Sequence, residues 1–298
     1  MKRFNILYIL GIFLMLSLSG CWKENLKNCW EGDVTFRVMA ERFQEVPGGA
    51  SEENLSDRIE TLHYYLYYEN VLFQQGSVDS KAALDVQQYI LTFPKLKFGN
   101  YSLALLANVD ENEIKATEHC EDLLFDYPGT SDTKDYFVSC YEFKVDCECG
   151  FEDFVVLYRA QGVTQFQLKD LPENITEVEV GLDQLHNTCG VDTTYQGNIA
   201  ASYRIKVEDL KEGDLLSFAI GSFPTITNQQ TGIVLKLYAD GDPEFVAYEE
   251  KITDINILRN QLVRISADFN HNISGKVHFG IQVNPAWDGI GGGDVPVE

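Results

Sequence analysis

The sequence predicts an all-β protein made of two tandem antiparallel β-sandwich domains with little helix. Many short segments alternate apolar and polar residues with a period of two, the pattern of half-buried strands. Turn-forming residues separate these segments at regular intervals. The chain also holds 15 tyrosines and 18 phenylalanines, which favour sheet over helix. Its 298 residues allow two domains of about 130 to 150 residues, each with its own core.

The N-terminus predicts export and lipid attachment. A positively charged start precedes an apolar segment, residues 6–18, that is too short to span a bilayer. The sequence Leu18-Ser19-Gly20-Cys21 follows and resembles the lipobox of bacterial lipoproteins. The resemblance implies that residues 1–20 are removed and that Cys21 carries acyl chains, which together anchor a protein stably. Residues 21–32 are then a lipidated polar tether. The alternative is an ordinary signal peptide with an incidental cysteine.

The composition argues against several function classes. The formal net charge is -23, so the chain repels nucleic acid and anionic headgroups, and we expect no nucleic-acid partner. Membrane attachment must then come from lipid. The sequence contains neither a Gly-x-Ser-x-Gly elbow nor a His-x-x-x-His pair. We therefore expect no enzyme, no cofactor and no small-molecule substrate.

The cysteine count is consistent with disulfides. Of the seven cysteines, Cys21 is assigned to lipid, and an even number remains in an exported protein. Fifteen pairings of six cysteines stay open. Cys147 and Cys149 would point the same way from a strand, so we do not expect them to pair with each other. No histidine lies nearby, so no metal site is predicted. The six are Cys29, Cys120, Cys140, Cys147, Cys149 and Cys189.

The first predicted domain covers residues 33–155. Its first strand runs from Asp33 to Arg42 and puts Val34, Phe36, Val38 and Ala40 on one face. A short helix should begin at Asp110, because Glu113 completes a capping box. The other strands are expected at 58–69, 70–73 (leading to a turn at Gly76), 89–93, 101–108, 135–145 and 151–159.

A tyrosine ladder marks the second strand of this domain. Tyr64 and Tyr68 share one face, and Tyr65 and Tyr67 share the other. Such a ladder suits cross-strand packing, which is our prediction. It also suits a stacking platform for sugars. That interpretation gives the alternative function, a surface lipoprotein that binds glycans or a host protein through aromatic strand faces.

The second predicted domain covers residues 156–283, although no linker composition marks the boundary. A glycine-rich tail, 284–298, follows, and we expect it to be mobile. Asp192-Thr193-Thr194 resembles the short O-glycosylation sequon of Bacteroides exported proteins, which implies Thr193 as an acceptor. Strands are expected at 163–168, 177–185, 199–207, 215–221, 233–238, 245–248, 262–269 and 277–283.

Taken in order, four stretches resemble the Bacteroidetes fimbrial anchor lipoproteins, the FimB-like minor and major fimbrium anchoring subunits. The resemblance implies two transthyretin-like sandwich domains and a surface-exposed outer-membrane lipoprotein at the base of a fimbrium. The stretches are the lipobox followed by Cys29, residues 59–73, residues 98–108, and the C-terminal pair 259–265 and 281–287.

The same resemblance implies fimbrial shaft or accessory subunits as partners, joined by strand exchange, in which backbone hydrogen bonds supply affinity. The first strand should stay in place, because no isolated cleavage loop precedes it and the lipid must remain attached. The C-terminal strand or tail would then engage the next subunit. The implied partner-binding residues are Val34, Phe36, Val38, Ala40, Val277, Phe279, Ile281 and Val283.

Overall fold

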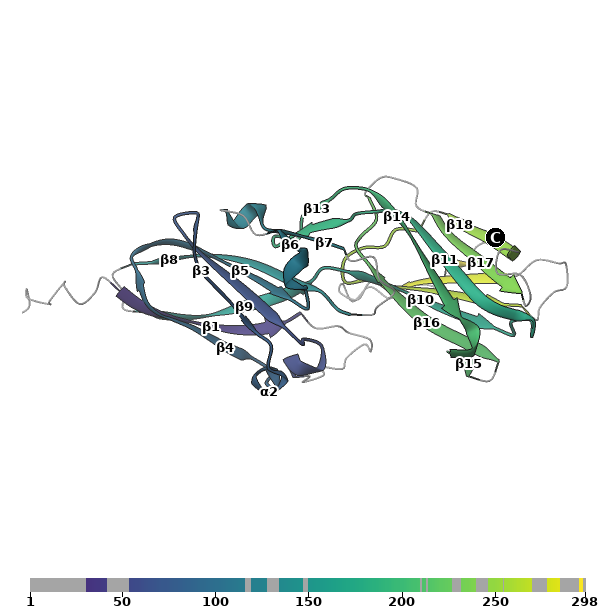
Figure 1. Cartoon of the computed structure of the whole chain (residues 1–298), viewed down its shortest axis with the longest axis horizontal. Helices are drawn as coiled ribbons and strands as arrows, with labels where there is room; N and C mark the ends of the chain where they lie inside the picture. Colours follow the sequence, from purple (N-terminus) through teal and green to yellow (C-terminus); the bar gives the residue numbers. More distant parts are fainter. Residues whose placement is uncertain are drawn as a thin grey trace, which may run out of the picture.

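The protein is nearly all β, as the sequence predicts, and forms two lobes joined end to end (Figure 1). We call residues 31–159 the first lobe and residues 162–284, together with 295–296, the second lobe. The one α-helix in the described part of the chain is α2, Lys81–Leu84. The computed structural model describes residues 31–41, 54–115, 119–127, 134–146, 150–209, 211–212, 214–226, 232–239, 246–253, 255–269, 278–284 and 295–296.

Seven strands build the first lobe, in the order β3-β2-β5-β8-β9-β1-β4. Strands β8 and β9 pair only through Phe137–Arg159 and Val138–Tyr158, so the sheet bends into two layers at this corner. The strands are β1 (Glu31–Ala40), β2 (Leu62–Tyr68), β3 (Val71–Val78), β4 (Tyr89–Lys97), β5 (Gly99–Ala107), β8 (Phe137–Val145) and β9 (Phe151–Arg159).

Strand β1 fills the centre of one layer. Its residues Val34, Phe36 and Val38 are completely buried, as the alternating pattern predicts. The Phe36 ring packs edge-on against four other rings at centroid distances from 5.1 to 6.3 Å, two of them from the opposite layer. Aromatic pairs of this geometry add stability beyond that of buried area. Strand β1 therefore holds the two layers together.

Two facing sheets build the second lobe. One has the order β15-β16-β10-β19-β20-β21 and the other β14-β11-β17-β18. Their strands are β10 (Gly162–Lys169), β11 (Ile175–Leu185), β14 (Ile199–Lys206), β15 (Lys211–Glu212), β16 (Leu215–Ser222), β17 (Gly232–Ala239), β18 (Val246–Thr253), β19 (Leu262–Asp268), β20 (His278–Asn284) and β21 (Val295–Pro296).

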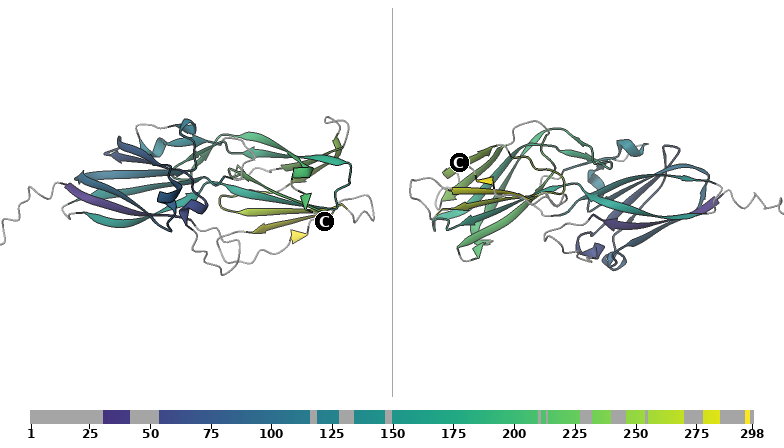
Figure 2. Two further views of the ribbon diagram at one scale, coloured as in Figure 1. Left: turned by 60° about the horizontal axis from the view of Figure 1, so that its bottom comes forward. Right: turned by 180° about the vertical axis from the view of Figure 1, so that it is seen from behind.

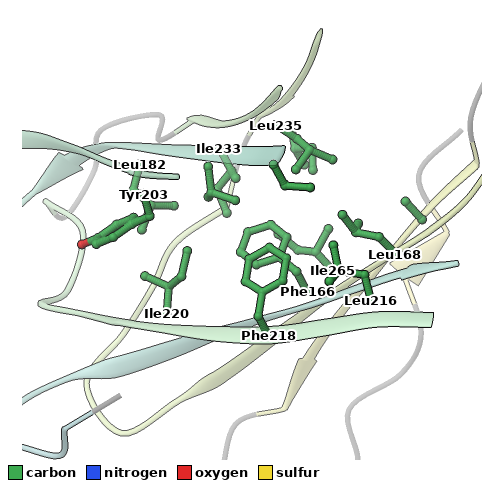
Figure 3. Packing of buried hydrophobic residues seen from close by; sticks show 14 of the residues in the cluster. Phe166, Leu168, Leu182, Tyr203, Leu216, Phe218, Ile220, Ile233, Leu235 and Ile265 are labelled. Carbon is green, nitrogen blue, oxygen red and sulfur yellow. The ribbon is translucent and has the colours of Figure 1, made fainter. Parts of the chain in front are cut away.

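Apolar side chains from both sheets of the second lobe meet in one core (Figure 3). At its centre the rings of Phe166 and Phe218 stack with their centroids 5.0 Å apart. Leu182, Ile233 and Leu235 cover them from the other sheet. This is the packing of a β-sandwich, in which alternate residues of each strand face inward.

Among the described strands, the pairing is antiparallel except for one pair of strands in each lobe. Strand β1 runs parallel to β9, and β10 runs parallel to β19. The sequence analysis expected antiparallel sandwiches throughout. A parallel pair needs a long connection, and in both lobes the partners are separated by most of the lobe's chain.

Most predicted strands are present, and β9 has the bounds expected for it. Residues 156–159 pair within the first lobe as part of β9, and the chain changes sheet at Ala160 and Gln161. The division into two domains stays a prediction. The expected helix at Asp110 is a single 3₁₀ turn, Glu111–Glu113, with its capping box formed. Gly76, expected in a turn, lies inside β3.

Phe36→Ala should lower the free energy of unfolding by about 3 to 5 kcal/mol, because it opens a cavity between the two layers. Chemical denaturation measures this change. Phe154→Ala is the matched control: Phe154 lies opposite Arg37 on the outer face, 53% exposed. We expect that variant to cost less than about 1 kcal/mol. Equal losses in the two variants would contradict the assigned inner face.

Candidate assembly surfaces and the joint between the lobes

Strand β1 carries four of the predicted partner-binding residues, and it lies inside its sheet. It pairs along one side with β4 and along the other with β9. Val34, Phe36 and Val38 are in the core, and Ala40 is half-buried at the end of the strand. A partner strand can contact these side chains only after β1 leaves the sheet. Their role in partner binding stays a prediction.

Strand β20 carries three of the other four predicted residues, and its outer side is partly covered. Along one side it pairs with β19 from Asn284 to His278. Along the other side, Gly280 and Ile281 pair with β21, which comes from the predicted tail. Phe279, Ile281 and Val283 are in β20. Val277 and Cys21 lie outside the described residues.

Strand β3 is an exposed edge that the sequence analysis did not single out. Val71 and Phe73 are 61% and 51% exposed, and β3 ends the order of strands in its sheet. Its eight residues include no charged side chain. Edge strands without charges or proline are open to pairing with another strand. The signal that could have found it is the uncharged sequence from Val71 to Val78.

A small sheet joins the two lobes. It has the order β13-β12-β7-β6, in which β6 (Ile114–Lys115) and β7 (Leu124–Asp126) come from the first lobe. Strands β12 (Thr188–Gly190) and β13 (Tyr195–Gln196) come from the second. Strands β7 and β12 pair directly across the boundary. Both views in Figure 2 show the two lobes meeting end to end.

A third apolar cluster, which we call the joint cluster, surrounds this sheet. It combines side chains from both lobes, and most of its members are buried. Phe125 of β7 and Phe223, which follows β16, meet edge to face at 5.3 Å. The members are Tyr65, Tyr67, Ala104, Leu106, Val109, Cys120, Leu123, Phe125, Tyr127, Tyr136, Val138, Ala160, Cys189, Val191 and Phe223.

The buried hydroxyl of Tyr127, a member of the joint cluster, links the first lobe to the second. The Tyr127 hydroxyl donates to the Gly221 carbonyl at 2.5 Å and bonds the Tyr203 hydroxyl at 2.7 Å. Burial raises the pKa of Tyr127 and of Tyr203 above the ordinary value, because it penalises a phenolate. The hydroxyls thus stay protonated, and can donate, to higher pH than that of a solvent-exposed tyrosine.

An ion pair forms a second link between the lobes, next to a buried ion pair within the first lobe. Arg259, just before β19, contacts Glu41 at 2.7 Å, and the same carboxylate accepts from the backbone N–H of Arg159. The Arg159 side chain is 2% exposed and contacts Asp135 at 2.9 Å. A buried arginine needs such partners, because a lone buried charge is costly. The sequence analysis placed Arg159 only at the end of an expected strand, 151–159.

The tyrosines of β2 pack inside the protein, as predicted. Tyr65 and Tyr67 belong to the joint cluster, and burial raises the pKa of both. Tyr64 is half-buried and packs against the Phe93 ring at 5.6 Å, and Tyr68 packs against Tyr101 at 5.0 Å. Tyr65 and Tyr67 are therefore not available as a stacking platform for sugars.

Three cysteines lie in the described residues, and all three are free thiols: Cys120, Cys140 and Cys189. In this structure no disulfide joins any two of these three cysteines. Cys21, Cys29, Cys147 and Cys149 lie outside the described residues. Thr193 lies in the turn between β12 and β13, where Asp192 accepts hydrogen bonds from Thr194. Its glycosylation stays a prediction.

A cleft of about 640 Å³ opens near the joint, and its lining carries charges of both signs, among them Arg58, Asp57 and Lys134. Asn108 is one of its lining residues, and the side-chain amide of Asn108 donates to the backbone carbonyls of Arg58 and of Asp135, both at 2.6 Å. Within the described ranges, no group of three metal-ligating side chains occurs. The helices described there are also too short to cross a bilayer.

Solved structures share this fold, although no family model and no curated protein matches the sequence. A Bacteroides thetaiotaomicron protein to which polysaccharide binding is ascribed is 11% identical, with a TM-score of 0.61 over 90% of this chain and 99% of that one. A fimbrial assembly protein of Parabacteroides distasonis is 10% identical, with a TM-score of 0.51 over 85% and 98%. The C-terminally truncated tip fimbrial protein Mfa3 of Porphyromonas gingivalis is 14% identical, with a TM-score of 0.51 over 84% and 99%.

These similarities cover nearly the whole of each solved chain, so both lobes and their order are shared. The resemblance to Bacteroidetes fimbrial proteins is thereby confirmed at the level of fold.

The stability of the joint should fall as the pH rises above about 10, the ordinary pKa of tyrosine. Burial raises the pKa of Tyr127 in the folded state. Above about pH 10, the Tyr127 hydroxyl is therefore deprotonated in the unfolded state but still protonated in the folded state. The contribution of Tyr127 to the free energy of unfolding is fully present below its pKa in the unfolded state and is lost as the pH rises above that value. Tyr127→Phe should flatten the dependence by up to about 1.4 kcal/mol per pH unit.

Thermal unfolding followed from about pH 8 to pH 11 tests this expectation. Tyr158→Phe, at an exposed ring on β9, reports the effect of removing a hydroxyl from the surface. A Tyr127→Phe variant that keeps the full slope of the wild type would show that Tyr127 is not the group responsible.

Proposed function

We propose that this chain is an outer-membrane lipoprotein that anchors a fimbrium to the cell. The observation that carries the proposal is the shared fold: both lobes align, almost end to end, with solved fimbrial proteins. The predicted lipid on Cys21 supplies the attachment to the membrane. Fimbrial shaft or accessory subunits are the partners, and the work is mechanical, with no chemical step.

The joint suits such a role. A fimbrium under tension pulls on the far lobe, and the pull reaches the lipid through the connection between the lobes. Here that connection combines backbone pairing between β7 and β12, the joint cluster and the pair Arg259–Glu41. Lobes linked by two residues alone would move independently. A joint of this kind opposes that motion.

The second lobe offers the surface for the next subunit. On its outer side β20 is paired with β21 at two positions within the described residues, so an extended strand can replace β21 and pair along β20. Strand β1 is less suitable, because its apolar face is the core of the first lobe. We infer that β1 stays in place and that β20 accepts a strand.

A lipid-free variant tests the anchoring role. In a strain whose own copy is deleted, Cys21→Ser should leave fimbriae assembled but released into the medium, since the predicted acyl chains are missing. The measurement is the ratio of shaft protein in the medium to that on cells. Cys29→Ser is the matched control and should keep fimbriae attached. Fimbriae of normal length that stay attached in the Cys21→Ser strain would refute the anchoring role.

A shortened chain tests which C-terminal segment meets the next subunit. Removal of residues 285–298 deletes β21 and leaves β20 in place. If β20 accepts a strand, the shortened protein should still co-purify with shaft subunits, at least as well as the full chain. The same measurement on the full chain is the reference. Loss of co-purification would instead identify the tail as the donor strand.

A further inference from the structure

Two thiols of the joint cluster lie in direct contact. Cys120 is in the 3₁₀ turn η5 (Cys120–Asp122), and Cys140 is in β8. Their Sγ atoms are 3.1 Å apart, although the residues are separated by twenty positions in the sequence. Cys120 is buried in the cluster, and Cys140 is half-buried against it. A disulfide has an S–S length of about 2.05 Å, so bond formation requires an approach of only about 1 Å.

Cys189 gives a comparison within the same cluster. It is completely buried on β12, and its Sγ donates to the carbonyl of Gly190 at 3.3 Å. Its thiol is thus directed at the backbone, whereas the thiols of Cys120 and Cys140 are directed at each other. Burial alone therefore does not create the contact, which depends on how η5 packs against β8.

We propose that Cys120 and Cys140 form an intramolecular disulfide bond in the exported protein. The inference rests on the export predicted from the N-terminus and is independent of the fimbrial role. Disulfides form and persist in the compartments to which export leads. Cys189 stays a thiol.

The reaction is thiol–disulfide exchange with a disulfide-bearing oxidoreductase as the oxidant. Cys140 attacks first, because it is the more exposed and because the hydrogen bond from Cys120 lowers the pKa of its thiol. Its thiolate breaks the donor's S–S bond, forms a mixed disulfide and releases one donor thiolate. The Cys120 sulfur loses its proton and attacks Sγ of Cys140, which releases the second donor thiolate. Two protein thiols are oxidised, and one donor disulfide is reduced to two thiols.

The bond would stabilise the joint. The chain between the two cysteines contains β7, the strand that pairs with β12 of the second lobe. Closing this loop constrains the unfolded chain and holds the start of β7 against β8. The bond would then hold β6 and β7, the first-lobe strands of the small sheet, against the seven-stranded sheet.

Peptide mapping tests the bond directly. Full-length protein, purified as cells export it, is unfolded with an alkylating agent and without reductant, and is then digested with trypsin. Cleavage after Lys115, Lys134 and Lys144 puts Cys120 in peptide 116–134 and Cys140 in peptide 135–144. We expect these two peptides to be linked and to separate on reduction. The peptide that carries Cys189 should be alkylated. Alkylated Cys120 and Cys140, or links from either to another cysteine, would overturn the proposal.

Thermal unfolding provides the second measurement. The double variant Cys120→Ala/Cys140→Ala, or reduction of the wild type, should lower Tm by about 5 to 10 °C. Reductant should have less effect on the double variant than on the wild type. Cys189→Ala is the matched control, because it removes a buried thiol of the same cluster and should keep the full response to reductant. An equal response of the wild type and the double variant would contradict the bond.

Discussion

The pairing of β7 with β12 is the interaction on which the arrangement of the whole molecule depends. Each of these strands has three residues, yet together they carry one sheet from the first lobe into the second. Backbone hydrogen bonds specify both distance and direction, and the joint cluster keeps water away from them. The same cluster takes up the inner tyrosines of β2, which would otherwise be an exposed aromatic face. The lobes are thus connected by packing as well as by the chain.

Arginines at and near this joint are paired with carboxylates. The chain holds 46 acidic side chains against 23 lysines and arginines, so most positive charges could find partners at the surface. Three arginines, Arg58, Arg159 and Arg259, are nevertheless paired at the joint with Asp135 and Glu41. Buried ion pairs add little net stability, because desolvation offsets the attraction. Of these pairs, Arg259–Glu41 joins the two lobes, and its direction and partner choice favour one orientation of the lobes over others.

Short-range patterns predicted much of the fold. The alternation of apolar and polar residues at 151–159 correctly predicted where β9 begins and ends. The same alternation in β1 correctly predicted that Val34, Phe36 and Val38 are buried. The capping pair Asp110 and Glu113 was also real, although it closes a single turn. In each case the information lies within a few neighbouring residues, because strand faces and caps depend on local geometry. The candidate site was predicted less well, since the burial of β1 and the partial cover on β20 depend on strands distant in sequence.

The sequence by itself determined the class of fold, the positions and faces of most strands, and the predicted export and lipid signal. The tertiary structure decided which surface covers each face. It showed that Tyr65 and Tyr67 face the joint, that β1 runs parallel to β9, and that Cys120 meets Cys140. The physical reason is that periodicity records which side chains share a face. What packs against that face depends on contacts between residues far apart in the chain, and strands of two or three residues are too short to have a period.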